Sequence, residues 1–319
     1  MSLPGRPKGE FRSAQHEGTP VSLPGRPKGE FRSAQHEGAP VSLPGRPKGE
    51  FRSAQHEGTA VSGALLGEFV GTLVLVPNTL DLGAAEVDLR EVLPQGVIRR
   101  AATLQHWVAE DARSTRAFLK RVGAIEPLAR PLQELSILEL PRPRKGSQES
   151  VPAQAWQALL APALQGQDLG LISEAGLPAV ADPGANLVAA AHAAGVPVLA
   201  LAGPSSLLLA LAASGLNGQS FAFVGYLPQD AAARSTRIRE LEALSRRLGQ
   251  TQLMIETPYR NAALLAALVG ALAPATRLSV SCGLTLQSGW SRTDTVSAWR
   301  QRPAEMPDRL PAVFALLAG

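Results

Sequence analysis

The sequence has a single cysteine and no long uninterrupted apolar run. Cys282 alone excludes an internal disulfide framework and any metal site built from several cysteines, which is typical of a protein from a reducing cytoplasm. The most apolar stretch, 187–216, is broken by glycine and proline at 195–197 and 203–204 into pieces too short to span a bilayer. The first twenty residues lack the apolar core of a signal peptide. We therefore expect a soluble cytoplasmic protein with no bound metal and no membrane contact.

The first sixty residues contain a repeat that has too few apolar side chains to form a core. SLPGRPKGEFRSAQHEG occurs three times with a period of twenty, at Ser2, Ser22 and Ser42. Each copy has one Leu and one Phe, so its burial cannot offset the entropy of ordering, and we expect residues 1–62 to be disordered. Each copy also holds three basic and two acidic residues, so the repeats supply +3 of the formal net charge of +4. The basic balance is therefore weak evidence that the remaining chain binds nucleic acid.

The rest of the chain alternates short apolar segments with longer segments of helical pattern. This alternation predicts an α/β fold with a parallel five-stranded sheet in residues 63–217. The turn-forming sequence 217–220 marks a boundary, and residues 218–319 are expected to form a second α/β domain with a mixed sheet. The expected strands are 72–77, 106–109, 135–141, 169–173, 196–201, 221–227, 251–257, 277–285 and 312–318, and the expected helices are 97–104, 113–122, 153–164, 185–194, 234–248 and 259–272.

Two loops with the composition of a ligand site follow neighbouring strands. The first is Ser173-Glu174-Ala175-Gly176-Leu177-Pro178, where Gly176 would let the backbone approach a ligand closely. Asp182-Pro183-Gly184 comes next and is expected to cap the helix over 185–194. The second loop is Gly203-Pro204-Ser205-Ser206. Because ligands bind beyond the carboxyl ends of strands in open α/β sheets, both loops predict a binding site at that edge.

The ordered segments SEAGLPAVADPG, LAGPSSLLLALAASGL, FVGYLP and IETPYR carry a family resemblance. Together they resemble the motif string of the tetrapyrrole-methylase superfamily of S-adenosylmethionine-dependent methyltransferases. The nearest branch is the small-subunit ribosomal RNA (cytidine-2′-O)-methyltransferase family, and the resemblance runs from about Gly71 to Ala318. It implies two α/β domains with S-adenosyl-L-methionine in the cleft between them, ribosomal RNA or the small ribosomal subunit as partner, and a homodimer.

The resemblance also implies which residues bind the methyl donor. Ser205 and Ser206 could alternatively be simple helix caps, and Arg260, which follows Glu256, could be a solvated helix residue. The implied donor-binding residues are Pro77, Ser173, Glu174, Ala175, Gly176, Pro178, Asp182, Ser205, Ser206 and Glu256.

A charged segment after the second expected strand resembles the family's Glu-Asp-Thr-Arg-x-Thr motif. The resemblance implies a catalytic role for Glu110, Asp111 and Arg113. Arg113, Arg116 and Lys120 are spaced to share one helical face, which suits an acceptor that carries phosphates. The alternative is that Asp111 begins the helix, where it complements the helix dipole, while the arginines lie in water.

Some positions depart from the family pattern and leave other functions open. The first loop, 77–83, lacks the usual glycine and proline positions, and 282–286 has no charged pair where the family has Arg-Glu-Leu-Thr-Lys. One alternative is a methyltransferase that acts on a tetrapyrrole or another small metabolite. The other is a non-catalytic relative that binds the cofactor or RNA.

Overall fold

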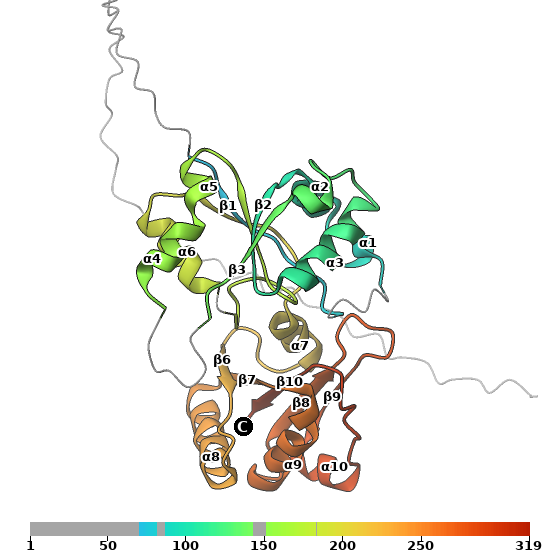
Figure 1. Ribbon diagram of the computed structural model, residues 1–319. Coiled ribbons are helices and arrows are strands. Elements are labelled where there is room, and N and C mark those ends of the chain that lie inside the picture. Colours follow the sequence, from blue (N-terminus) through green and yellow to red (C-terminus); the bar gives the residue numbers. More distant parts are fainter. Residues whose placement is uncertain (1–69, 82–86, 143–150, 183) are drawn as a thin grey trace, which may run out of the picture. The chain divides into compact units, whose positions relative to one another are not determined.

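The computed structural model describes residues 70–81, 87–142, 151–182 and 184–319, which belong to one compact unit within 64–319 (Figure 1). The repeats at 1–62 lie outside the described residues. The predicted boundary between 217 and 218 falls between two sheets and stays a prediction. Within the described part of the chain, no helix is both long and apolar enough to cross a membrane.

The first sheet contains five parallel strands in the order β3-β2-β4-β1-β5, as the sequence predicts. Its residues alternate between two cores: Val74 packs into one cluster with Trp107, while Leu73 packs into another with Val108. Both faces are therefore buried, which explains the nearly continuous apolar strands. The strands are β1 (Leu73–Leu75), β2 (His106–Ala109), β3 (Ser136–Glu139), β4 (Leu169–Ile172) and β5 (Val198–Ala200).

Helices cover both faces of this sheet (Figure 1). One face carries α1 (Leu89–Val92), α2 (Gln95–Thr103) and α3 (Ala112–Gly123), with the short 3-10 turn η1 (Leu132–Glu134) beside them, and the other carries α4 (Ala153–Leu159), α5 (Ala161–Leu164) and α6 (Ala185–Ala193). The single helix predicted over 153–164 is wrong, because the chain breaks at Leu160 between α4 and α5. Pro162 has no N–H to continue the hydrogen-bond ladder, so the second helix starts afresh.

A glycine makes room for the largest side chain in the first core. Trp107 on β2 pairs across the sheet with Gly170 on β4 and is fully buried. A Cβ on Gly170 would lie 2.6 Å from Cε3 of the indole ring. Gly170 is therefore required by packing and not by backbone conformation.

The second sheet is mixed, as predicted, with strand order β6-β7-β10-β8-β9. β6 and β7 are parallel and the other pairs are antiparallel. β9 is not among the predicted strands, because it lies at the edge of the sheet and its sequence, WSRTDT, is polar. The strands are β6 (Phe221–Tyr226), β7 (Thr251–Glu256), β8 (Arg277–Cys282), β9 (Trp290–Thr295) and β10 (Ala312–Leu317).

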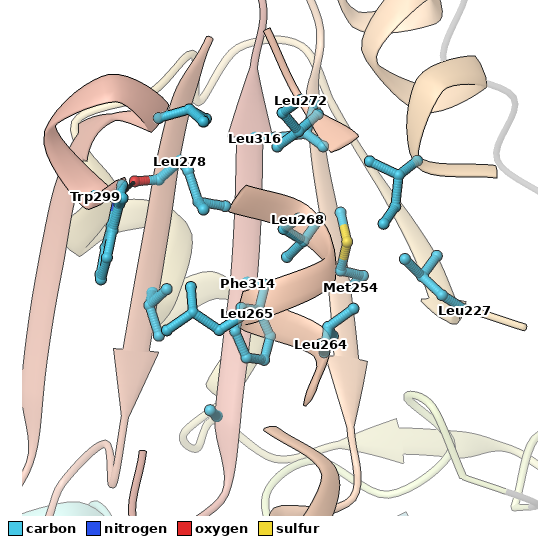
Figure 2. Close-up of a cluster of buried hydrophobic side chains, with 14 of the residues drawn as sticks. Leu227, Met254, Leu264, Leu265, Leu268, Leu272, Leu278, Trp299, Phe314 and Leu316 are labelled. Atoms are coloured by element: carbon cyan, nitrogen blue, oxygen red, sulfur yellow. Dashed lines mark hydrogen bonds between the residues drawn. The ribbon is translucent and has the colours of Figure 1, made fainter. Parts of the chain in front are cut away.

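The core of the second sheet lies against α8 (Ala231–Leu248), α9 (Asn261–Ala271) and α10 (Val296–Gln301) (Figure 2). Phe314 and Met254 occupy its centre, and the indole N–H of Trp299 donates to the carbonyl oxygen of Leu278 at 2.9 Å. The remaining helix, α7 (Ser206–Ser214), packs Leu207 and Leu211 on β7 and β10 in a separate cluster. The helix that follows the second predicted loop is thereby attached to the second sheet.

Candidate functional site

Residues at the carboxyl ends of strands from both sheets line a pocket of about 400 Å³. Glu110 follows β2, residues 174–177 follow β4, and Ser205 and Ser206 follow β5. From the second sheet, Tyr226 and Glu256 end the parallel strands β6 and β7. A concave pocket with the volume typical of small-ligand sites therefore lies at the carboxyl edge, where the sequence predicts a ligand site.

The lining of this pocket is acidic. Glu110, Glu174, Asp182 and Glu256 line it, and no lysine, arginine or histidine is among the described residues that do. Burial and the carboxylates of Glu110 and Asp111 raise the pKa of Glu174, against the opposing effect of a nearby arginine. Burial, with the charges of Glu110 and Glu174, raises the pKa of Asp182 to about 7, although a hydrogen bond with a serine opposes the shift. The pocket therefore favours cationic ligands and disfavours phosphate groups.

Among the described residues that line the pocket, Glu256 forms an ion pair with an arginine. The guanidinium of Arg260 lies 3.0 Å from its Oε2, and both side chains are largely buried. The backbone N–H of Thr257 donates to the other carboxylate oxygen at 2.9 Å. Arg260 therefore fixes the chain after β7 and is not a solvated helix residue.

Asn78 holds the loop after β1 and the loop after β4 together. Its side-chain amide donates to the carbonyl oxygens of Ser173 and Glu174 at 3.1 and 3.0 Å. Its backbone N–H donates to the carbonyl of Gly176 at 2.9 Å, and the N–H of Gly176 donates back to Thr79 at 3.3 Å. Despite its departure from the family pattern, the loop after β1 is therefore built into the wall of the pocket.

The three residues predicted to be catalytic have different positions. Glu110 lines the pocket, and its Oε2 accepts the backbone N–H of Glu174 at 3.1 Å. Asp111 is the N-cap of α3: its carboxylate accepts the N–H of Ser114 at 2.6 Å, and this bond lowers the pKa of Asp111. Arg113 is exposed on α3. Neither Asp111 nor Arg113 lines the pocket, and the catalytic roles stay predictions.

The structure brings most of the predicted donor-binding residues together. Pro77, Ser173 and Pro178 do not line the pocket, although each adjoins a lining loop. The predicted residues that do line it are Glu174, Ala175, Gly176, Asp182, Ser205, Ser206 and Glu256.

The caps of α6 and α7 can be compared with the sequence-based interpretation. Gly184, from the predicted Asp-Pro-Gly cap, occupies the N-cap position of α6, and Asp182 lines the pocket. Ser205 is the N-cap residue of α7 but its side chain makes no capping hydrogen bond. Ser205 is only 8% exposed and belongs to the pocket lining.

The backbone conformation of the loop after β4 gives a further reason for a glycine at position 176. Gly176 has φ +69°, and a Cβ there would meet Leu80 and the carbonyl of Pro204 at 3.2 and 3.3 Å. Glycine is thus needed for the left-handed conformation and for protein contacts, not only for space beside a ligand. Ala179 and Ala181 also have positive φ, at 65° and 64°, a strained conformation for alanine that occurs at functional loops.

Sequence reasoning missed two residues of the site. Asn78 lies in the loop after β1, and nothing in the local sequence indicates that its side chain reaches a carbonyl 95 residues away. Tyr226 also lines the pocket. It lies in the FVGYLP segment, for which the family resemblance implies no role of the aromatic ring. The aromatic position in that motif was the available signal.

Comparison with known proteins identifies related sequences. The sequence model of the family described as Tetrapyrrole (Corrin/Porphyrin) Methylases matches residues 71–288. Proteins named ribosomal RNA small subunit methyltransferase I are similar: the one from Mesorhizobium japonicum is 34% identical over 59% of this chain and 58% of its own. That from Micromonospora olivasterospora is 34% identical over 63% and 56%, and that from Vibrio cholerae 40% identical over 34% and 36%. The chain thus spans less than two thirds of these relatives' length.

Solved structures also resemble the fold. The methyltransferase CobJ is 16% identical, with a TM-score of 0.47 over 78% of this chain and 100% of its own. A uroporphyrin-III C-methyl transferase from Thermus thermophilus, complexed with S-adenyl homocysteine, is 19% identical, with a TM-score of 0.45 over 77% and 97%.

Proposed function

Because the chain belongs to the Tetrapyrrole (Corrin/Porphyrin) Methylases family, we propose that it is an S-adenosylmethionine-dependent methyltransferase that acts on small-subunit ribosomal RNA. The observation that carries the proposal is the pocket, whose described lining has four carboxylates, one of them paired with Arg260, and no basic side chain. S-Adenosylmethionine carries a sulfonium and an ammonium group, and both are attracted by such a lining. A cofactor with phosphates would be repelled by it.

Each part of the pocket has a role in this proposal. The N–H groups at the start of α7 and the hydroxyls of Ser205 and Ser206 would hold the methionyl carboxylate, since helix N-termini bind anions. Glu174 and Asp182 would surround the cationic groups. The donor supplies a methyl group on a positively charged sulfur, ready for in-line displacement. The residues of the chain orient that methyl group and exclude water.

Glu110 is the lining carboxylate that adjoins the basic helix α3. Its position suggests a separate role for each of the predicted catalytic residues Glu110, Asp111 and Arg113. Glu110 would accept the proton that the acceptor ribose hydroxyl loses as its oxygen displaces sulfur from the methyl carbon, with S-adenosylhomocysteine as the leaving group. Asp111 sets the start of α3, and the exposed Arg113 would contact a phosphate of the RNA. Arg116 and Lys120 are also exposed on this helix and extend the same basic face.

The proposal includes a cytoplasmic homodimer, as the resemblance implies. Large apolar side chains are exposed on α7, at Leu208 and Leu209, and on the edge strand β6, at Phe221 and Phe223. Covering them in a dimer would remove this apolar surface from water. Sedimentation equilibrium should give a dimer mass for wild type and a monomer mass for Leu208→Glu. A monomer mass for wild type would remove the dimer from the proposal.

The test is transfer of a labelled methyl group. The protein is incubated with methyl-labelled donor and unmethylated small ribosomal subunits, and the RNA is digested to nucleosides; we expect the label on a ribose oxygen. Glu174→Lys should abolish transfer and donor binding, because it places a cation in the pocket. Glu91→Lys, the same change at an exposed carboxylate on α1, should leave both unchanged. Label found only on a tetrapyrrole or another small metabolite would refute the RNA acceptor, and no transfer with intact donor binding would indicate a non-catalytic relative.

A further inference from the structure

The only two tyrosines in the chain lie at the same edge of the second sheet. Tyr226 ends β6, and Tyr259 lies in η2 (Pro258–Arg260), directly after the neighbouring parallel strand β7. The two residues are 60% and 72% exposed. Tyrosine rings of this size normally bury much of their area, so two exposed rings beside one pocket indicate a surface for a partner.

A bulge in β6 turns Tyr226 toward the side of the sheet that faces the pocket. The register shifts between Phe223 and Tyr226, so that Phe223 pairs with Leu253 and Tyr226 with Ile255. The extra residue falls in the part of the strand containing Gly225, whose φ is +72°. Tyr226 therefore lies on the same sheet face as Phe223, although strict alternation would place it on the opposite face. It both lines the pocket and is largely exposed, which places it at the mouth.

The backbone beneath Tyr259 is fixed on both sides. Arg260 forms its ion pair with the buried carboxylate of Glu256, and its N–H donates to the carbonyl of Thr257 at 2.9 Å. Thr257 and Pro258, which precede Tyr259, line the pocket. The ring of Tyr259 is thus presented from a held turn next to the mouth, so little backbone entropy would be lost when it binds a ligand.

The charge of the site decides which group can meet these rings. Because the lining is acidic, a phosphate would be repelled from the pocket, whereas α3 carries exposed basic residues that could hold one. A neutral planar group can enter without that penalty. We propose that Tyr226 and Tyr259 form a stacking platform for an unpaired nucleobase of the RNA, adjacent to the ribose that is methylated. This rests on the proposed function and narrows its substrate to a single-stranded or extruded nucleotide, since a base stacked within a duplex hides its faces.

The experiment compares how much the nucleobases and the sugar–phosphate backbone each contribute to RNA binding by the full-length protein. Affinities are measured by fluorescence anisotropy for a single-stranded RNA of about twelve nucleotides and for an abasic ribose-phosphate strand of equal length and charge. Wild type should prefer the base-bearing strand. Tyr226→Leu and Tyr259→Leu should each reduce that preference, by about tenfold for a lost stacked ring, while Tyr259→Phe should retain it. The comparison cancels charge contributions from the rest of the chain, because both probes carry the same phosphates.

The outcomes separate this inference from the proposed function. Equal preference for the base-bearing strand in wild type and both leucine variants would overturn the platform. So would a Tyr226→Leu variant that lost affinity for S-adenosylmethionine by calorimetry but kept its base preference, since the ring would then serve the donor. Transfer of the methyl label to RNA by wild type, with an unchanged KM for RNA in Tyr259→Leu, would refute the platform and leave the proposed function intact. Failure of wild type to label RNA would refute the proposed function itself.

Discussion

Donor binding should depend on pH through Asp182, whose pKa burial and neighbouring carboxylates raise to about 7. Below this value the side chain is protonated, so one negative charge facing the cationic donor is lost. Above it the carboxylate is ionised and attracts the sulfonium and ammonium groups. Affinity should therefore rise with pH, and binding of the cation should in turn release a proton from Asp182.

The pKa sets the size of the effect. With a pKa of about 7, the ionised fraction is roughly a tenth at pH 6 and roughly nine tenths at pH 8. If the ionised form carries most of the affinity, the dissociation constant should fall about tenfold over this range. Titration calorimetry at several pH values measures the dissociation constant. Repeating each titration in buffers of different ionisation enthalpy measures the proton released.

Asp182→Asn is the matched control, because asparagine keeps the shape of the side chain but cannot titrate. Its dissociation constant should not show this fall, so the ratio of the variant's constant to that of wild type should grow about tenfold between pH 6 and pH 8. Titration of the donor's own amino group affects both proteins equally and cancels in the comparison. Parallel pH curves for wild type and variant would refute the argument, because the carboxylate would then not sense the donor.

Three further predictions concern packing, the loops and RNA. Gly170→Ala should destabilise the fold by about 1–3 kcal/mol in urea unfolding, because the added methyl overlaps a buried indole ring; Gly218→Ala, where a Cβ meets nothing within 4 Å, should be nearly neutral. Asn78→Ala should lower the free energy of unfolding by about 1–3 kcal/mol, since buried carbonyls lose their donor, and should weaken donor binding in calorimetry; unchanged donor affinity would contradict a role in the pocket wall. Alanine at both Arg113 and Arg116 should flatten the salt dependence of RNA affinity by about one slope unit per lost phosphate contact, whereas superimposable slopes would favour the small-metabolite acceptor.

The sequence predicts best the elements that are buried on both sides. The predicted bounds of β2, His106–Ala109, agree with the structure, because a strand covered by helices on both faces is mostly apolar, here from Trp107 to Ala109. The polar edge strand β9 has no such signal, since one side of an edge strand faces water. The break between α4 and α5 was signalled by Pro162, but the uninterrupted apolar pattern favoured one helix.

The candidate site was predictable as a set of loops but not as a set of contacts. Strand-end position brought Glu174 and Ser205 into the predicted site, and both line the pocket. Which residues face inward depends on backbone conformations that composition does not encode, such as the bulge before Tyr226. The reach of Asn78 across to the other loop depends on strands β1 and β4 being neighbours, which is a property of topology.

The hydrogen bonds that join the loop after β1 to the loop after β4 have a consequence for motion. Bonds run in both directions between Asn78–Thr79 and Ser173–Gly176, so neither segment can swing away without breaking the contacts of the other. The two walls, distant in sequence, should open as one cooperative unit, and their amides should exchange with solvent at a common rate. A ligand held by either wall would slow exchange in both. Gating of the pocket would then be a single concerted event shared by two loops.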